Sequence, residues 1–278
     1  VVFRGPVFPY GPPVFERIIH ALNPHMIYDI DDAVWERPAY VSSFALKLHD
    51  FDWIWKMCRL CKHGIVGNEH LKAHVEKHNP AVTIIPTCVD MDVHTAKTYP
   101  PPAENRPVTL GWTGLSNNLG YFEVIKDVLR ELAEKHAFVL QIASNSPYTL
   151  EGVEVVNRRW ELACEADYLK EPDVGLMPLV DSPRARGKCA FKALEFMAVG
   201  TPCVISPVGM NKDIIEDGKT GFLADSPEAW HDTLERLIVD PALRERMGRA
   251  ARQFVIKHYA HEVHYPRLRD VLERVASL

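Results

Sequence analysis

Residues 173–206 read DVGLMPLVDSPRARGKCAFKALEFMAVGTPCVIS, and this stretch decides the fold. The short apolar run Val174–Met177 is typical of a buried strand, and a second run follows at Cys203–Ile205. Between the two runs, apolar residues recur at helical spacing, which predicts a helix over Cys189–Val199 with Phe191, Leu194 and Ala198 on its inward face. Strand, helix and strand in this order are typical of two parallel strands joined by a crossover helix.

Short apolar runs and helical patterns alternate in the same way along the rest of the chain. We expect further strands at Val1–Phe3, Met26–Ile30, Gly64–Val66, Val82–Ile85, Val108–Trp112, Phe138–Ile142, Val153–Val156 and Gly221–Leu223. We expect further helices at Val14–Leu22, Val41–Leu60, Asn68–Lys77, Leu119–Lys135, Ala163–Leu169 and within Pro227–Ser277. This order predicts an α/β protein with two Rossmann-like domains, each built on a parallel sheet, which would bind a ligand at the strand carboxyl ends.

The run Pro100–Pro102 is the best candidate for a linker between the two domains. We therefore predict a partial N-terminal domain over residues 1–103 and a C-terminal domain over residues 104–260. A last helix within residues 261–278 is expected to pack back toward the first domain. Because Val1–Phe3 resembles the tail of a buried strand, we expect the chain to begin inside a domain, with the first domain incomplete at its N-terminus.

The composition limits the function classes. The net charge is −5 and charged residues of both signs make up 25% of the 278 residues, which argues against a general nucleic-acid surface. No apolar run approaches the roughly 20 residues of a transmembrane helix. The six cysteines are scattered, several of them in apolar runs, which indicates a reduced, cytoplasmic protein. Peripheral contact with a membrane stays open.

Basic residues gather before and within the helix predicted over Cys189–Val199. Lys188, Lys192 and Glu195 fall at i, i+4 and i+7, so they are expected to share one helix face. The helix N-terminus attracts anions, and Arg184 and Arg186 would add full positive charges. The Glu195 carboxylate could accept hydrogen bonds from a ribose. The pattern therefore suits a nucleotide, although a solvated helix face with an ordinary lysine–glutamate pair is the alternative.

Four stretches carry a resemblance to a known family. Ala190–Ser206, the hairpin Ile214–Leu223, the helix Leu243–Ile256 and the loop Leu110–Gly114 resemble the signature of the group 1 (family 4) retaining glycosyltransferases. The resemblance covers nearly the whole chain and is weaker in its first third. It implies the GT-B fold and an enzyme that transfers a sugar, with retention of configuration, from a nucleoside-diphosphate sugar to an acceptor hydroxyl.

The resemblance also implies roles for single residues. Glu195 matches the glutamate that contacts the nucleotide ribose. A second glutamate of the family, which contacts the donor sugar, would fall at Gly187, so sugar recognition must differ in this chain. Lys188 or Lys192 would then contact phosphate or sugar, and Lys192 would act catalytically by stabilising the departing diphosphate.

Glycines and a serine at strand ends complete the expected donor site. Gly111 and Gly114 are expected to let the backbone approach the phosphates, with an ordinary tight turn as the alternative. Ser144 follows the next strand, where the family binds base or ribose. The expected donor-binding residues are thus Gly111, Gly114, Ser144, Arg186, Gly187, Lys188, Lys192 and Glu195.

Three carboxylates end the strand Met26–Ile30, at Asp29, Asp31 and Asp32. The resemblance implies that Asp31 and Asp32 occupy the place of a histidine–aspartate pair that faces the donor sugar. We expect them to orient donor or acceptor hydroxyls and count them with Lys192 as catalytic. A metal site of the D-x-D kind is one alternative, and a structural role in helix capping and loop hydrogen bonds is the other.

The function expected from the sequence is therefore glycosyl transfer in glycan or glycoconjugate biosynthesis. We expect no cofactor and no metal, a nucleotide-sugar donor, and a glycan, small-molecule or lipid-linked acceptor, without nucleic acid as a partner. Two alternatives are kept. One is a sugar-nucleotide epimerase or a phosphorylase on the same fold, and the other is a non-catalytic fragment that binds nucleotide sugars.

Overall fold

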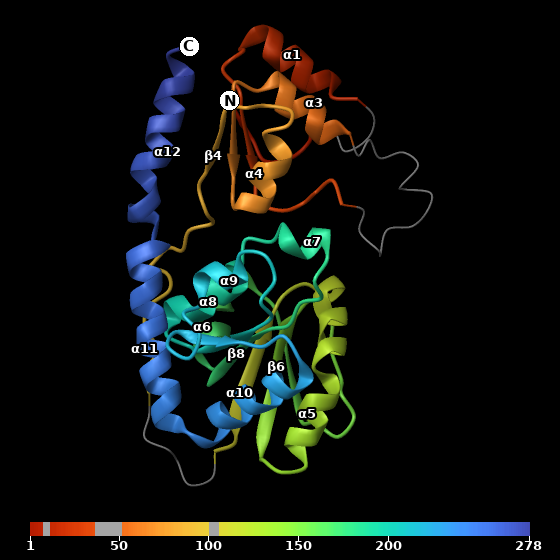
Figure 1. The fold of residues 1–278 in the computed structure, drawn as a ribbon, viewed down its shortest axis with the longest axis vertical. Coiled ribbons are helices and arrows are strands. Elements are labelled where there is room, and N and C mark those ends of the chain that lie inside the picture. The colour runs from red at the N-terminus through yellow and green to blue at the C-terminus, as the bar shows by residue number, and fades with distance from the viewer. Residues whose placement is uncertain (8–11, 37–51, 100–105) are drawn as a thin grey trace. The chain divides into compact units, whose positions relative to one another are not determined.

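The computed structural model describes residues 1–7, 12–36, 52–99 and 106–278, which form two compact units (Figure 1). Unit 1 comprises Val1–Thr87, Ser182–Cys189 and Glu262–Leu278, and unit 2 comprises Cys88–Asp181 and Ala190–His261. The expected linker at Pro100–Pro102 and the expected boundary after residue 103 lie outside the described residues. The first division between the units falls at Thr87 and Cys88.

Unit 1 holds a parallel sheet of four strands in the order β1-β2-β3-β4. These strands are β1 (Val2–Phe3), β2 (Ile27–Ile30), β3 (His63–Val66) and β4 (Val82–Ile84). The helices are α1 (Val14–Leu22), α3 (Trp53–Leu60), α4 (Glu69–Val75), the short α7 (Pro183–Arg186) and α12 (His261–Ala276). Of the helix predicted over Val41–Leu60, the structure describes only the part from Asp52 onward.

Unit 2 holds a parallel sheet of six strands in the order β10-β9-β8-β5-β6-β7. Its strands are β5 (Val108–Thr113), β6 (Phe138–Ser144), β7 (Val155–Arg159), β8 (Val174–Met177), β9 (Cys203–Ile205) and β10 (Gly221–Leu223). Its helices are η1 (Ser116–Val124), α5 (Lys126–Ala133), η2 (Leu162–Cys164), α6 (Glu165–Lys170), α8 (Phe191–Val199), α9 (Asn211–Ile214), α10 (Pro227–Val239) and α11 (Pro241–His258). The strand order reverses between β5 and β8, and ligands of such sheets bind beyond the strand carboxyl ends at this switch point.

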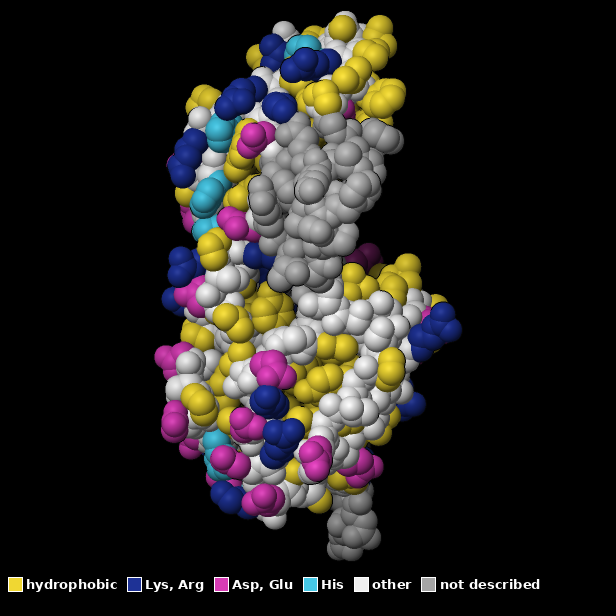
Figure 2. All heavy atoms as spheres, turned by 90° about the vertical axis from the view of Figure 1, so that its right-hand side faces the viewer, with side chains coloured by type: hydrophobic (Ala, Val, Ile, Leu, Met, Phe, Trp, Pro, Cys, Tyr) yellow, Lys and Arg dark blue, Asp and Glu magenta, His cyan; other side chains and the backbone are white. Residues whose placement is uncertain are grey.

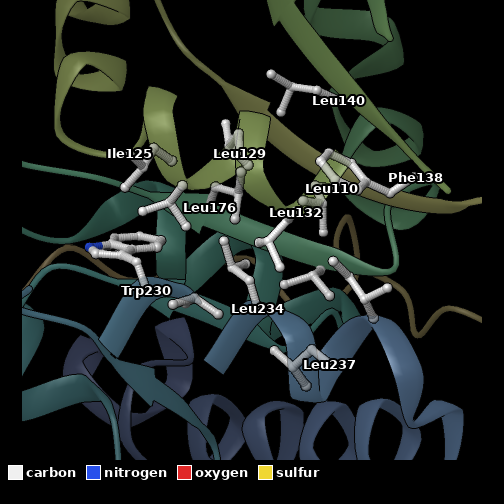
Figure 3. Close-up of a cluster of buried hydrophobic side chains, with 14 of the residues drawn as sticks. Leu110, Ile125, Leu129, Leu132, Phe138, Leu140, Leu176, Trp230, Leu234 and Leu237 are labelled. Carbon is white, nitrogen blue, oxygen red and sulfur yellow. The ribbon is translucent and has the colours of Figure 1, made fainter. Parts of the chain in front are cut away.

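The core of unit 2 lies between the sheet and the helices α5 and α10 (Figure 3). Leu110, Leu140 and Leu176 project from β5, β6 and β8, and each is at most 1% exposed. Leu129 of α5 and Trp230 of α10 pack into the same cluster and are equally buried. Parallel strands covered on both faces require such apolar runs, so the sequence pattern and the burial have one cause.

The core of unit 1 includes the last helix of the chain. Val271 and Val275 of α12 pack with Ile27 of β2 and Ile65 of β3, and all four side chains are at most 4% exposed. The ring of His25 lies 2.8 Å from the backbone carbonyl of Val275, through its Nδ1 atom. Residues far apart in sequence therefore build this unit together, because α12 covers one face of the sheet.

The predicted elements are confirmed in type and differ mainly at their ends. Helix α8 begins at Phe191, so Lys188 lies before the helix and not on its face. Phe191 is 37% exposed, so the expectation that it faces the core is wrong, whereas Leu194 and Ala198 are buried. The helix predicted over Leu119–Lys135 is a 3-10 helix followed by α5.

Surface side chains of both charge signs are interspersed on the face drawn in Figure 2. Helix α1 in unit 1 shows the reverse of the usual burial pattern. It exposes the apolar side chains of Ile18, at 54%, and Leu22, at 83%, while Glu16 is buried. The Glu16 carboxylate accepts a hydrogen bond from the Val7 amide at 2.7 Å, which compensates its burial. Over the described residues, every helix is too short or too polar to cross a membrane.

Candidate active site

The N-terminus of α8 has an unusual backbone. Ala190, its N-cap residue, has a φ of 54° and is the one non-glycine residue of the described chain in the left-handed region. This conformation costs an L-residue about 1 kcal/mol, and such strain gathers at functional sites. No side chain of the described residues caps the helix. The first-turn amides are therefore available to an anion beside the switch point of the sheet.

Lys192 and Glu195 form an ion pair on α8. The Lys192 Nζ atom lies 2.9 Å from Glu195 Oε2, and the Glu195 side chain is 1% exposed. A buried carboxylate needs such a partner, because desolvation of an unpaired charge costs several kcal/mol. Glu195 therefore does not lie on a solvated helix face. The alternative that it forms an ordinary surface pair with lysine is wrong.

A second carboxylate completes the pairing of Lys192. Glu165, the first residue of α6, accepts from the Lys192 ammonium at 3.1 Å and from the Trp160 indole N–H at 3.2 Å. Burial lowers the pKa of Lys192, but the charges and hydrogen bonds of Glu195 and Glu165 outweigh it and raise the pKa. Lys192 thus stays charged at neutral pH, and the cluster of Lys192, Glu165 and Glu195 carries a net negative charge.

His94 approaches the same cluster from a loop of unit 2. Its Nε2 atom lies 3.8 Å from Glu195 Oε1, on the oxygen that Lys192 does not bind. Its Nδ1 atom lies 2.8 Å from the Asp90 carbonyl oxygen, and Arg252 of α11 donates to the His94 carbonyl at 2.6 Å. The ring is buried, at 8% exposure of the residue. His94 and Glu165 were not predicted from the sequence, since neither stands in a motif.

Gly111 in the switch-point strand β5 and Gly114 just after it both have close packing neighbours. Gly111 lies within β5, opposite Gln141 of β6, and a Cβ atom there would overlap the Pro172 ring. The Gly114 amide donates to the Ala143 carbonyl at 3.1 Å, and a Cβ atom there would lie 2.7 Å from the Trp112 ring. For Gly111 these contacts explain the glycine without a phosphate.

Gly111→Ala is expected to lower the free energy of unfolding by about 2 kcal/mol, because overpacking displaces the Pro172 ring. Urea denaturation followed by circular dichroism measures the change. Gly120→Ala is the control, because a Cβ at Gly120 meets open space. A Gly111→Ala variant as stable as the Gly120→Ala variant would contradict the packing explanation.

Ser144 lines a pocket of about 340 Å³ at the carboxyl ends of β6 and β7. Asn157 is fixed there by two hydrogen bonds to the backbone of Tyr148, at 2.8 and 2.9 Å. Arg158 and Arg159 give the wall positive charge. The residues that line the pocket are thus mainly polar, and two of them are arginines.

Asp31 and Asp32 lie at the end of β2 in unit 1. Arg4 donates to the Asp31 carboxylate at 2.7 Å, and the Asp31 side chain is 53% exposed. Asp32 accepts from the Ala33 amide at 2.8 Å and lies 3.8 Å from the guanidinium of Arg184. Asp32 thus makes a loop hydrogen bond, and both carboxylates are paired with arginines.

Gly187 packs directly on this strand end within unit 1. A Cβ atom at Gly187 would lie 2.8 Å from the Ala33 amide nitrogen. Asn68 donates its side-chain amide to the carbonyls of Gly187 and Lys188, at 3.1 and 3.2 Å, and its Oδ1 accepts from the Leu71 amide at 2.9 Å. Ala33 thus leaves no room for a glutamate at position 187, which accounts for the departure from the family pattern.

The expected site residues fall into two groups. Asp31, Asp32, Arg186, Gly187 and Lys188 belong to unit 1, where Arg186 is exposed at the end of α7. Gly111, Gly114, Ser144, Lys192 and Glu195 belong to unit 2. Within unit 2 the structure joins Lys192 to Glu195 directly and places the other three on the neighbouring strands β5 and β6 or just beyond.

Known proteins resemble the segment around α8 in sequence. Residues 180–254, which include all of α8, match the family model described as glycosyl transferases group 1. The chain is 42% identical over 88 residues to the D-inositol 3-phosphate glycosyltransferase of Arthrobacter sp. (strain FB24), a match that covers 31% of this chain and 20% of that relative. The matched part is thus a fifth of the relative's length.

Solved structures resemble the chain over most of its length. Sucrose-phosphate synthase from Thermosynechococcus elongatus has a TM-score of 0.70 at 16% identity, covering 95% of this chain and 71% of that one. Anabaena Alr3699/HepE in complex with UDP has a TM-score of 0.64 at 14% identity, covering 91% and 72%. At these identities the likeness establishes the fold.

The two parallel sheets and these likenesses define an α/β protein of the GT-B glycosyltransferase fold, which confirms the predicted fold class. The segment 180–254, which includes α8, is in addition similar to the group 1 glycosyltransferases.

Proposed function

We propose that the protein transfers a sugar from a nucleoside-diphosphate sugar to an acceptor hydroxyl, with retention of configuration. One observation carries the proposal. The segment that matches the family model contains α8, and the first turns of α8 hold the Lys192–Glu195 pair beyond the carboxyl ends of the sheet in unit 2. Nucleotides bind to doubly wound sheets at this place.

Stabilisation of the leaving diphosphate is the main catalytic task in this proposal. Glycosyl transfer passes through an oxocarbenium-like state, and negative charge grows on the departing phosphate. The uncapped first turn of α8 and the Lys192 ammonium supply positive potential there. Arg186 and Lys188 would add charge from the preceding loop. The scheme uses no metal and no cofactor.

Glu195 and the Ser144 pocket would hold the nucleoside. A buried carboxylate accepts hydrogen bonds from ribose hydroxyls without a competing water shell. The pocket of about 340 Å³ beside Ser144 has room for a base. The Alr3699/HepE structure, of the same fold, was solved in complex with UDP, which supports a nucleoside diphosphate as part of the donor.

Asp31 and Asp32 would orient hydroxyl groups of donor or acceptor. Their carboxylates are strong acceptors held by Arg4 and Arg184. We propose a glycan, small-molecule or lipid-linked acceptor, and a role in glycan or glycoconjugate biosynthesis in the cytoplasm. The family match and the relatives do not favour an epimerase or a phosphorylase.

A panel of UDP, ADP, GDP and their glucose or mannose esters tests the proposal by thermal shift and calorimetry. At least one nucleotide is expected to raise the melting temperature, because a ligand that binds only the native state stabilises it. Glu195→Gln, which keeps the side-chain volume, should weaken binding at least about tenfold, the loss of one charged hydrogen bond.

Glu123→Gln is the matched control, because Glu123 also pairs with a lysine three residues away but lies on the surface of unit 2. It should bind the nucleotide as the unchanged protein does. The proposal is wrong if no member of the panel binds, or if Glu195→Gln binds as tightly as Glu123→Gln.

A further inference from the structure

His94 is a neighbour of Glu195 whose side chain can take up a proton near neutral pH. Glu195 has two oxygens, and Lys192 occupies Oε2 at 2.9 Å. The other oxygen, Oε1, faces the Nε2 atom of His94 at 3.8 Å. The protonation of this imidazole therefore decides whether Oε1 faces an N–H donor or a lone pair.

The tautomer of His94 follows from its second contact. The Nδ1 atom lies 2.8 Å from the Asp90 carbonyl oxygen, and a carbonyl can only accept, so Nδ1 must carry a proton. In the neutral ring Nε2 is then unprotonated, and its lone pair faces the Glu195 carboxylate. Only the imidazolium presents an N–H and a positive charge to Oε1.

The loop that carries His94 is held in place. The His94 amide donates to the Asp90 carbonyl at 3.0 Å, and the Asp90 carboxylate accepts from the Asp92 and Val93 amides at 2.9 and 3.3 Å. Arg252 of α11 donates to the carbonyls of His94 and Ala198. The ring cannot easily turn away from Glu195.

We propose that His94 is a positioning residue for Glu195, and that its protonated form holds the carboxylate for nucleotide binding. This inference rests on the proposed function. With neutral His94 the cluster of Lys192, Glu165 and Glu195 has a net charge of about −1, and protonation brings it to about zero. A cluster without net negative charge repels the diphosphate less, so the nucleotide binds more tightly at lower pH.

The charged groups around His94 agree with this direction. Burial lowers the pKa of His94, but the Glu195 carboxylate, the Asp90 carbonyl and the more distant Glu165 raise it above its usual value of 6.5. The opposing positive groups are Lys192, which Glu195 and Glu165 neutralise, and Arg252, which contacts the backbone of His94. These groups thus stabilise the imidazolium of His94 next to the Glu195 carboxylate.

The test measures the dissociation constant of a nucleoside-diphosphate sugar between pH 6 and pH 8. The probe is UDP-glucose, or the sugar ester from the panel above that binds, because both of its phosphates are esterified and neither titrates in this range. The unchanged protein should lose about fivefold in affinity as the pH rises, the lower end of usual coupling between two sites.

Two variants separate positioning from folding. His94→Gln removes the titration while its amide can still donate to Glu195, so its affinity should be independent of pH. His136→Gln is the control, because His136 also contacts a glutamate, Glu235 at 2.9 Å. His136 lies just before the amino end of β6, whereas the candidate site lies beyond the carboxyl ends of the strands. This control should keep the pH profile of the unchanged protein.

Stability gives a second readout that needs no ligand. Because the folded pKa of His94 is raised, the pair stabilises the fold below the unfolded pKa of about 6.5, and this contribution is lost as the pH rises through the folded pKa. The melting temperature of the unchanged protein relative to His94→Gln should therefore be higher at pH 6 than at pH 8.

The outcomes are distinguishable. Binding without a pH dependence, or a His94→Gln variant with the slope of the unchanged protein, overturns the role of His94 and leaves the proposed function intact. Absence of binding at every pH overturns the proposed function and this inference together. A sloping profile that His94→Gln alone flattens supports the inference.

Discussion

Lys192→Met is expected to lower the free energy of unfolding by about 3 kcal/mol, because removal of one partner leaves buried charge uncompensated. Lys192 lies between Glu195, which is 1% exposed, and Glu165, at 2.9 and 3.1 Å. Without the ammonium, two carboxylates lose their positive partner in a poorly solvated place. Methionine keeps most of the length of the side chain and its apolar stem, so the change mainly tests charge. Urea denaturation at pH 7 measures the loss.

A matched control variant separates the effect of a buried ion pair from that of an exposed one. Lys126→Met is the matched control, because Lys126 also pairs with a glutamate three residues away, at 2.6 Å, but on the surface of the unit. Such exposed pairs contribute little. Equal losses for Lys192→Met and Lys126→Met would show that the cluster on α8 is not a stabilising network.

Trp230→Ala is expected to cost about 4 kcal/mol of unfolding free energy, since it leaves a large cavity between α10 and the sheet. Trp230 is 1% exposed, and among the described residues it has the largest of the fully buried side chains. Its ring packs with leucines of α5 and the strands (Figure 3). Far-ultraviolet circular dichroism in urea measures the change without relying on tryptophan fluorescence.

Trp230→Phe should cost much less, about 1.5 kcal/mol. Among the described residues the Trp230 indole N–H has no hydrogen-bond partner, and a buried unpaired donor is itself unfavourable. Phenylalanine keeps most of the ring and removes that donor. Leu162→Ala serves as the surface control, because Leu162 is 74% exposed. If Trp230→Ala were as mild as this control, the core of unit 2 would not depend on α10.

Much of the fold was predictable because parallel sheets leave a strong pattern. The strands Val174–Met177, Cys203–Ile205 and Gly221–Leu223 and the helix Val14–Leu22 were predicted with their exact bounds. Each of the three strands is a run whose apolar residues must be covered by neighbouring elements. Element ends were less accurate where loop contacts compete, as at Ala190, whose left-handed backbone delays the start of α8.

The candidate site was predictable only in part. The sequence predicted that Lys192 and Glu195 share one helix face, because their spacing on a helix fixes their proximity. His94 and Glu165 lie 101 and 30 residues before Glu195 in the sequence. Nothing local in the chain links them to α8, and only the packing of the loop and of α6 brings them there.

The sequence by itself determined the α/β class, the alternation of strands and helices and the helix that carries Lys192 and Glu195, because these depend on local periodicity. Only the tertiary structure decided that Glu195 is buried and shared between Lys192 and His94, and that Ala33 excludes a side chain at Gly187. Burial and steric exclusion depend on which distant segments meet, and a pattern along one chain does not contain that information.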